Sequence, residues 1–376
     1  DISLIAIFIL IYVNQPSMQQ ERSELSLFRD YFRCEESASL SQIREIAAVS
    51  AETVNNMANA SANAVAMQKT AFLLNTKGVK VLDALWKNNM SFFGTEELDV
   101  LKVIVATDGT RPSYPVSNGI AQTALYENSE WKSLTDSRSA NLKKAVDCTG
   151  RINLFNIAAG TGFLVAPNLI MTNRHVLQGI TEKNNRTSFV NSVFVDFSCE
   201  NSDTNGSQKV RVKKVVYTGP DEISSASEGK QDMALLEIEN NGNLPAPVAV
   251  CKDCPDTKNA DIFLIGFPNQ KSVSPSEGRV FRDFFESMMG YKKIAPGKII
   301  DGKNFWPGRF CHDASSLRGN SGSLIVAAGK EECAIGLHYG GTMGPPSENW
   351  AHEMSLFCDP ESELKQIFAA YGVQYA

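Results

Sequence analysis

Several features that mark specialised classes of protein are scarce or absent in this chain of 376 residues. It has no block of consecutive lysines or arginines, and its formal net charge of −6 argues against nucleic acid as the main partner. Its eight cysteines are spread along the chain, which excludes a small disulfide-stabilised scaffold. With 43% hydrophobic and 21% charged residues, the composition is that of a globular protein of two or three domains with a sizeable core.

Zinc-binding patterns and histidines are also scarce. Cys251 and Cys254 form a lone C-x-x-C without a second pair or a histidine at zinc spacing. This pattern favours a local disulfide or two free thiols over a structural zinc site. Because the chain has only 4 histidines, the position of each is informative.

The first residues are hydrophobic. Residues 2–13 form an almost unbroken apolar run, shorter than the ~20 residues that span a bilayer. Because the chain begins at Asp1, we expect a processed product or a fragment in which residues 1–20 are the end of a membrane anchor or of a signal sequence. The alternative is a core strand or buried helix. The segment favours secretion or membrane association over a cytoplasmic location.

Residues 21–100 are predicted to form a helical N-terminal region. Apolar residues recur there at intervals of three and four, at positions Ile43, Ala47, Val54, Met57, Val65 and Phe72. This apolar stripe is too weak for a coiled coil. Two interpretations stay open, a plain spacer and a set of helices that binds a regulator.

Residues 101–149 are predicted to link this helical region to the remainder of the chain. Two prolines within residues 108–115 indicate a turn and an extended segment. Residues 127–146 then show helical spacing, and Gly150 ends that amphipathic helix.

Residues 150–376 are predicted to be mainly β. Short apolar runs alternate there with Gly, Pro, Asn and Asp, which indicates an all-β barrel or sandwich. The strands are expected near residues 152–157, 161–166, 169–172, 192–197, 210–217, 233–238, 262–266, 324–328 and 334–338. An amphipathic helix over residues 360–370 completes the chain.

A serine in a glycine turn carries the first sign of chemistry. Gly319 and Gly322 flank Ser321, and an apolar run follows at once. Glycines allow the backbone to bend so that the amides of Gly319 and Ser321 converge. Two convergent amides beside a hydroxyl are what an oxyanion hole next to a serine nucleophile requires.

The partners that such a serine needs are present upstream. His175 stands where an apolar strand ends, and Asp232 opens another apolar run, where a carboxylate needs a partner. We therefore predict a triad in which Ser321 attacks a carbonyl, His175 transfers its proton and Asp232 fixes the tautomer of the imidazole. Taken singly, a surface histidine, a strand-edge aspartate and a turn serine are each ordinary.

The three stretches around these residues resemble the signature blocks of the trypsin-like serine proteases, and within them the bacterial V8/glutamyl-endopeptidase-like branch. The stretches are Thr161–Val176, Asp232–Leu236 and Gly319–Ser323. The resemblance covers about residues 150–358 and implies a two-barrel fold, with His175 and Asp232 on the first barrel and Ser321 on the second. It implies no metal and no cofactor.

Two residues next to Ser321 bear on how far the resemblance to trypsin extends. Asn320 stands where trypsin has the aspartate that pairs with a new N-terminus, so cleavage at Arg151-Ile152 is not expected to activate the chain by that route. Arg318 precedes the predicted oxyanion glycine, and its side chain is expected either in the substrate cleft or in solvent.

Specificity is indicated by His338. The segment Gly336–Gly341 is similar to the one that places a histidine in the S1 pocket of glutamyl endopeptidases and viral 3C-like proteases, where it binds Glu or Gln. The alternative is a buried structural histidine. The resemblance places Ser315 at the base of the pocket, and the absence of an acid there disfavours Lys or Arg as the P1 residue. His312 and Asp313 lie just upstream and receive no role.

The sequence thus predicts a mainly β, two-barrel serine endopeptidase preceded by a helical region, acting on protein or peptide substrates through an acyl-enzyme. Two alternatives remain. One is a catalytically silent binding or scaffolding module of the same fold. The other is the protease part of a membrane-associated sensing or defence protein.

Overall fold

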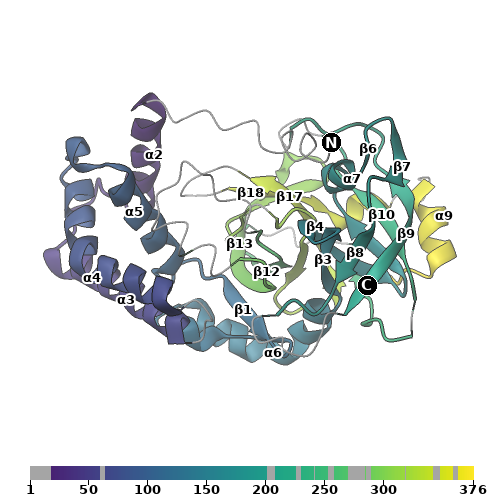
Figure 1. Cartoon of the computed structure of the whole chain (residues 1–376), viewed down its shortest axis with the longest axis horizontal. Helices are drawn as coiled ribbons and strands as arrows, with labels where there is room; N and C mark the ends of the chain where they lie inside the picture. The colour runs from purple at the N-terminus through teal and green to yellow at the C-terminus, as the bar shows by residue number, and fades with distance from the viewer. Residues whose placement is uncertain are drawn as a thin grey trace.

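We describe a computed structural model of the chain (Figure 1). It describes residues 18–59, 64–200, 208–225, 230–240, 242–252, 258–269, 284, 289–317, 319–341, 348–358 and 363–376, with the backbone alone at 18–24 and 301–306. The apolar segment 2–13, Cys254 and Arg318 lie outside the described residues. Of the helices that the structure describes, none combines the length and apolar character that crossing a bilayer requires.

The N-terminal region is helical, as predicted. Its elements are α2 (Met18–Tyr31), α3 (Leu40–Asn59), α4 (Ala64–Trp86), the short helix η1 (Met90–Phe92) and α5 (Thr95–Thr107). Helices α3 and α4 pack closely, because Gly78 of α4 faces Ala47 of α3 and a Cβ on Gly78 would lie 3.2 Å from the Ala47 Cβ.

Two residues of the predicted apolar stripe are not buried. Ile43, Ala47, Val54 and Met57 of α3 are buried, whereas Val65 and Phe72 of α4 are 67% and 68% exposed. The predicted stripe crosses a boundary between two helices, because α3 ends at Asn59 and α4 begins at Ala64. The two helices therefore have different helical phase, and α4 buries Met67, Ala71 and Leu74 instead.

Between the helices and the barrels the chain forms a short hairpin and a helix. These are β1 (Tyr114–Ser117), β2 (Ile120–Ala121), η2 (Thr123–Tyr126) and α6 (Trp131–Asp147). Tyr31 of α2 donates a hydrogen bond to Asp108 (2.9 Å) and contacts Thr110. The Trp131 Nε1–H of α6 donates to the Thr110 carbonyl (2.9 Å). Residues 108–110 are thus fixed to the helical region on one side and to α6 on the other.

The first barrel is a closed ring of six antiparallel strands in the order β10-β5-β4-β3-β8-β9. Its strands are β3 (Thr149–Leu154), β4 (Ile157–Ala166), β5 (Leu169–Thr172), β8 (Val193–Asp196), β9 (Lys209–Thr218) and β10 (Ala234–Ile238). Helix α7 (Arg174–Ile180) and the hairpin β6 (Thr181–Glu182) and β7 (Asn185–Phe189) follow β5. Every residue of β5 and β10 is buried, as expected of strands in a filled barrel.

The second barrel closes because β12 pairs with both β15 and β13. Its six strands are β12 (Asp261–Gly266), β13 (Lys293–Trp306), β14 (Arg309–His312), β15 (Leu324–Ala327), β17 (Gly336–Gly341) and β18 (Asn349–Glu353). Outside the ring, β1 pairs with β13, and the short strands β11 (Ala249–Val250) and β16 (Cys333–Ala334) pair in parallel. The short helix η5 (Met354–Cys358) and helix α9 (Glu363–Tyr371) end the chain, the latter close to the predicted range.

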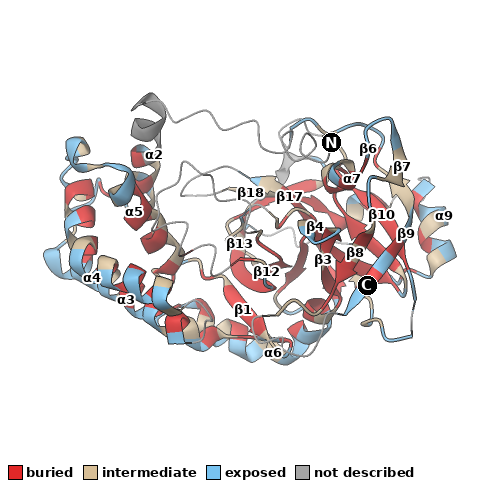
Figure 2. Ribbon diagram, in the orientation of Figure 1, coloured by how far each residue is buried: buried red, intermediate tan, exposed pale blue. Residues whose placement is uncertain are grey.

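The buried residues connect these parts (Figure 2). One cluster of buried apolar side chains includes Val54 and Ile104 of the helical region, Val116 of β1, and Phe163 of the first barrel. A second cluster, with Ile262 and Phe310 among its members, fills the second barrel. The mainly β, two-barrel fold with a helical region before it was therefore predicted correctly.

Candidate active site

His175 and Asp232 are joined by two hydrogen bonds. His175 is the second residue of α7, the helix that follows β5. Asp232 lies just before β10, and β5 and β10 are paired neighbours in the first barrel. The backbone amide of His175 donates to Asp232 Oδ1 (2.9 Å), and its ring Nδ1 lies 2.6 Å from Asp232 Oδ2. The Asp232 side chain is 2% exposed and that of His175 is 32% exposed. The imidazole is thus fixed at one nitrogen and open to solvent elsewhere.

The Asp232 carboxylate is stabilised in its charged form although it is buried. Burial by itself would raise the pKa of Asp232, but the charge of His175 and the hydrogen bonds from its ring and amide outweigh burial and lower the pKa. Asn173, which precedes α7, donates its side-chain amide to the Asp232 carbonyl (2.9 Å). Hydrogen bonds therefore fix both the carboxylate and the backbone carbonyl of Asp232.

His352 of β18 supports Asp232 from the second barrel. The backbone amide of Asp232 donates to His352 Nε2 (3.1 Å), which requires that this nitrogen be unprotonated. Burial and the nearby Arg309 lower the pKa of His352 to about 3, so the ring is neutral at physiological pH. The ring stacks on Tyr339, with centroids 4.3 Å apart.

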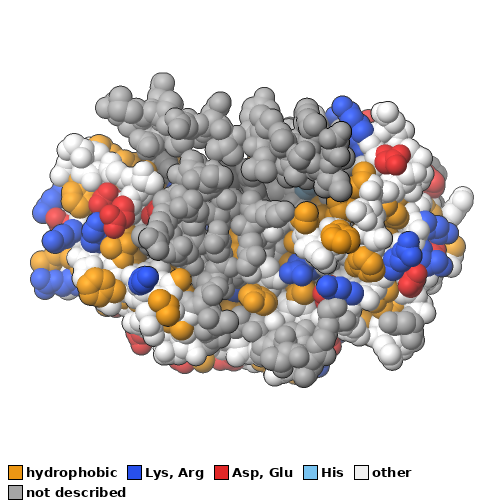
Figure 3. Space-filling view, in the orientation of Figure 1, with side chains coloured by type: hydrophobic (Ala, Val, Ile, Leu, Met, Phe, Trp, Pro, Cys, Tyr) orange, Lys and Arg blue, Asp and Glu red, His pale blue; other side chains and the backbone are white. Residues whose placement is uncertain are grey.

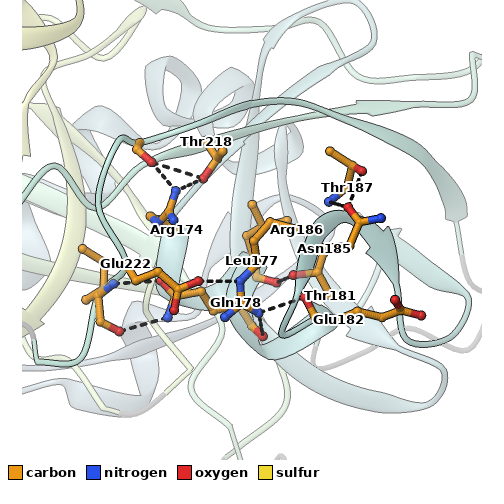
Figure 4. A network of polar contacts seen from close by, with 12 residues as sticks. Arg174, Leu177, Gln178, Thr181, Glu182, Asn185, Arg186, Thr187, Thr218 and Glu222 are labelled. Atoms are coloured by element: carbon orange, nitrogen blue, oxygen red, sulfur yellow. Dashed lines mark hydrogen bonds and ion pairs between the residues drawn. The ribbon is translucent and has the colours of Figure 1, made fainter.

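Helix α7 is anchored by a polar network on the first barrel (Figure 4). Arg174 donates to Thr218 and to the Gly219 carbonyl, at the end of β9. Gln178 donates to the carbonyl of Ile223 (2.9 Å) and accepts from its amide (2.8 Å). Because Arg174 precedes His175 directly, these contacts fix the backbone that carries the imidazole.

Ser321 lies in a tight turn before β15. Gly319 and Gly322 have φ values of +101° and +87°, which favour glycine. A Cβ on Gly322 would lie 2.0 Å from the Thr161 carbonyl oxygen, so no larger residue fits there. The Ser323 amide donates to the Asn320 carbonyl (2.8 Å) and closes the turn.

Strand β4 holds this turn against the first barrel. The Thr161 amide donates to the Ser321 carbonyl (2.8 Å), and the Thr161 hydroxyl donates to the Gly319 carbonyl (2.9 Å). A Cβ on Gly160 would lie 2.7 Å from a methyl of Val176 and 3.2 Å from the Ser321 carbonyl oxygen. Gly160 thus lies between the residue after His175 and Ser321, and the structure brings the three predicted triad residues to one place between the barrels.

The backbone amides of Gly319 and Ser321 are the two predicted to form an oxyanion hole. Within the described residues, neither the Gly319 amide nor the Ser321 amide donates a hydrogen bond. Asn320 is buried, and its side-chain oxygen accepts a long bond from Ser323 Oγ (3.4 Å). Arg151-Ile152 lies inside β3, which pairs with β4 and β8.

His338 lies on β17 next to the Ser321 turn. The Gly322 amide donates to the His338 carbonyl (2.9 Å), and the His338 amide donates to the Ser323 carbonyl (3.0 Å). His338 is 3% exposed, and its ring Nδ1 lies 3.2 Å from Nε2 of the fully buried His312. Burial and the charge of His175 lower the pKa of His338 to about 3, and burial is the largest cause of the low pKa of His312.

Ser315 is half-buried and tied to the segment that precedes β1. Its hydroxyl donates to the Arg111 carbonyl (2.7 Å). The Arg111 guanidinium lies 3.6 Å from the Asp313 carboxylate, which also accepts a bond from the Lys298 amide (2.6 Å). Residues 313–315 are therefore positioned partly by a residue from outside the two barrels.

Sequence reasoning missed three contributors to this site. His352 and Arg111 act through contacts with residues 120 and 204 positions away, which no local pattern indicates. Thr161 opens one of the three stretches that carry the resemblance, but only the fold shows that it binds the turn around Ser321. The small number of histidines was the one available signal for His352.

Comparison with known proteins identifies a peptidase domain within the chain. Residues 160–337 match the family model of the trypsin-like peptidase domain. A glutamyl endopeptidase of Staphylococcus epidermidis is 25% identical over 288 residues, which cover 74% of this chain and 86% of that protein. The solved structure of mouse neuropsin, a serine protease, is 16% identical, with a TM-score of 0.44 over 60% of this chain and 96% of that one. A solved Glu endopeptidase is 17% identical, with a TM-score of 0.42 over 60% and 90%. The chain thus contains a trypsin-like peptidase domain and is a serine endopeptidase similar to the glutamyl endopeptidases.

Proposed function

We propose that the chain cleaves peptide bonds with Ser321 as nucleophile, His175 as general base and acid, and Asp232 as the residue that orients the imidazole. The observation that carries the proposal is the double hydrogen bond between His175 and Asp232 beside the Ser321 turn. With its Nδ1–H directed at Asp232, the imidazole has Nε2 available to take the Ser321 proton.

In the first step Ser321 Oγ attacks the carbonyl carbon of the substrate while His175 Nε2 accepts the hydroxyl proton. The amides of Gly319 and Ser321 receive the negative charge that develops on the carbonyl oxygen. His175 then gives the proton to the leaving amine, and the acyl-enzyme remains on Ser321. Water, deprotonated by the same nitrogen, releases the acyl group and restores the serine.

We further propose that His338 binds the side chain of a P1 Glu or Gln, with Ser315 at the base of the pocket. Its Nδ1 is engaged by His312, and Nε2 makes no hydrogen bond to the rest of the described chain. If the shared proton resides on His312 Nε2, His338 Nε2 is protonated and can donate to a side-chain carbonyl or carboxylate. Because both rings are buried and neutral, His312 acts as a positioning residue for this tautomer.

A fluorophosphonate probe tests the nucleophile. The probe should label the folded chain and should not label Ser321→Ala, because it reacts only with an activated serine. The absence of labelling in the folded protein would favour a catalytically silent module of the same fold.

A peptide library tests the pocket separately. Wild type should prefer Glu or Gln at P1, and His338→Ala should lose that preference while still hydrolysing the best non-preferred peptides. A preference that is absent, or that survives the substitution, would show that His338 does not form S1.

A further inference from the structure

An apolar patch lies on the first barrel close to the candidate site. It consists of Phe155, Ile157 and Val190, which are 59%, 45% and 39% exposed. Phe155 lies in the turn between β3 and β4, and Ile157 is the first residue of β4. The Phe155 amide donates to the carbonyl of Ser192 (2.8 Å), two residues after Val190. Figure 3 shows apolar side chains gathered over β3 and β4 on the visible face.

The backbone at this turn is unusual for the residue that it carries. Phe155 has a φ of +56°, a conformation that Asn and Gly adopt readily and a bulky aromatic rarely does. The next residue is Asn156, so an ordinary turn residue was available one position away. A strained aromatic that is largely exposed has no role in the core, and strain of this kind is found at binding sites.

The patch is linked to both catalytic elements. The Val190 amide donates to the Ile180 carbonyl (3.1 Å), at the end of the helix that carries His175. Strand β4 begins at Ile157 and includes Thr161, whose amide donates to the Ser321 carbonyl. The residues between are Ala158, Ala159 and Gly160, so no large side chain separates the patch from the nucleophile turn.

The geometry points to a particular part of the substrate. In the proposed mechanism the P1 side chain is bound by His338 on the second barrel, and the leaving amine receives its proton from His175 on the first. The leaving half of the substrate therefore extends over the first barrel. Thr161 lies four positions after Ile157 along the strand, which at a rise of ~3.3 Å per residue is about 13 Å. An extended substrate covers that distance in about four residues.

We propose that Phe155, Ile157 and Val190 form a subsite for apolar side chains two to four residues after the scissile bond, so that the preferred substrates carry Leu, Ile, Val or Phe there. This subsite rests on the proposed function. It acts on the leaving half, independently of the P1 pocket, and it selects polypeptides over short substrates.

Three substrates with the same preferred P1 residue test the subsite. Two are peptides with either Leu or Ser at the second to fourth positions after the scissile bond, and the third ends at P1 in a chromogenic leaving group. Wild type should show a kcat/KM for the Leu peptide about tenfold above that for the Ser peptide. Phe155→Asn, in which the new residue suits the positive φ, and Ile157→Thr should each bring this ratio close to one. For each variant, the rate on the short substrate measures its basal activity.

Phe72→Gln is the matched control, because Phe72 is a similarly exposed aromatic on α4 in the helical region. It should keep the tenfold ratio. The subsite is overturned by a wild-type ratio near one, or by a ratio that Phe155→Asn and Ile157→Thr leave unchanged. In either case, hydrolysis of the short substrate would still support the proposed function. A wild type that hydrolyses none of the three substrates overturns both.

Discussion

Mild acid should destabilise this protein through its buried histidines. His338 and His352 are held neutral by burial, with pKa values of about 3, whereas histidines in an unfolded chain have a pKa of about 6.5. Between these values the unfolded chain binds protons that the folded protein does not. Stability therefore rises with pH in this window, is fully present above about pH 6.5 and is lost as the pH falls toward 3.

The expected loss is large compared with the whole stability of a domain. At about pH 5 each of the two imidazoles costs about 2 kcal/mol relative to neutral pH, or about 4 kcal/mol for the pair. A typical domain has only about 5–15 kcal/mol in total. The Asp232 carboxylate, whose pKa is lowered, adds to the loss only as the pH falls below about 4.

Urea unfolding of Ser321→Ala at about pH 7 and about pH 5 measures this difference without self-digestion. His338→Gln and His352→Gln in the same background should each reduce the pH-dependent loss by about 2 kcal/mol, because each removes one group that titrates in the unfolded chain alone. Comparing variants cancels the contributions of all other groups. If both variants lose as much free energy of unfolding as the parent, to within about 0.5 kcal/mol, the two rings are not held neutral in the folded protein.

Three further outcomes are expected. Asp232→Asn should lower kcat about 10³–10⁴-fold with little change in KM, because the wrong tautomer of the imidazole is favoured; a decrease below tenfold in steady-state assays would exclude this role. His352→Phe removes the acceptor of the Asp232 amide and should lower kcat about tenfold, whereas His352→Gln, which keeps an acceptor, should restore most of it. Gly322→Ala should cost about 3 kcal/mol or more in thermal unfolding, since its Cβ would meet the Thr161 carbonyl. Gly329→Ala, with a φ of +90° but nothing within 4 Å, should cost about 1 kcal/mol, and equal losses would contradict the steric argument.

The fold class was predictable because its signals are local. Strand β5 was predicted at its observed bounds, since a short apolar run followed by Asn and Arg leaves little ambiguity. Strand β13 was missed, because Pro296 and Gly297 and several lysines interrupt its apolar pattern. It forms because β12 and β14 pair with it on either side, which is tertiary information.

In the candidate site, too, the features with local signals were predictable and those that depend on tertiary packing were not. His175, Asp232 and Ser321 stand at strand ends and in a glycine turn, positions that the sequence marks. The proximity of His312 to His338 could not be predicted, because it depends on how β14 and β17 pack within the second barrel. The exposure of Phe72 could not be predicted either, since it depends on where α3 ends.

The pairing of β1 with β13 bears on how the protease can be produced as a fragment. The Val116 amide donates to the Lys292 carbonyl (3.0 Å), and Tyr114 and Pro115 lie opposite Ile294 and Lys293. A fragment that begins at Gly150, where the resemblance to proteases starts, would lack this strand and leave the first residues of β13 as an open sheet edge. Open edges pair with other chains, so such a fragment should aggregate, whereas the full chain, which keeps β1, should stay monodisperse in size-exclusion chromatography.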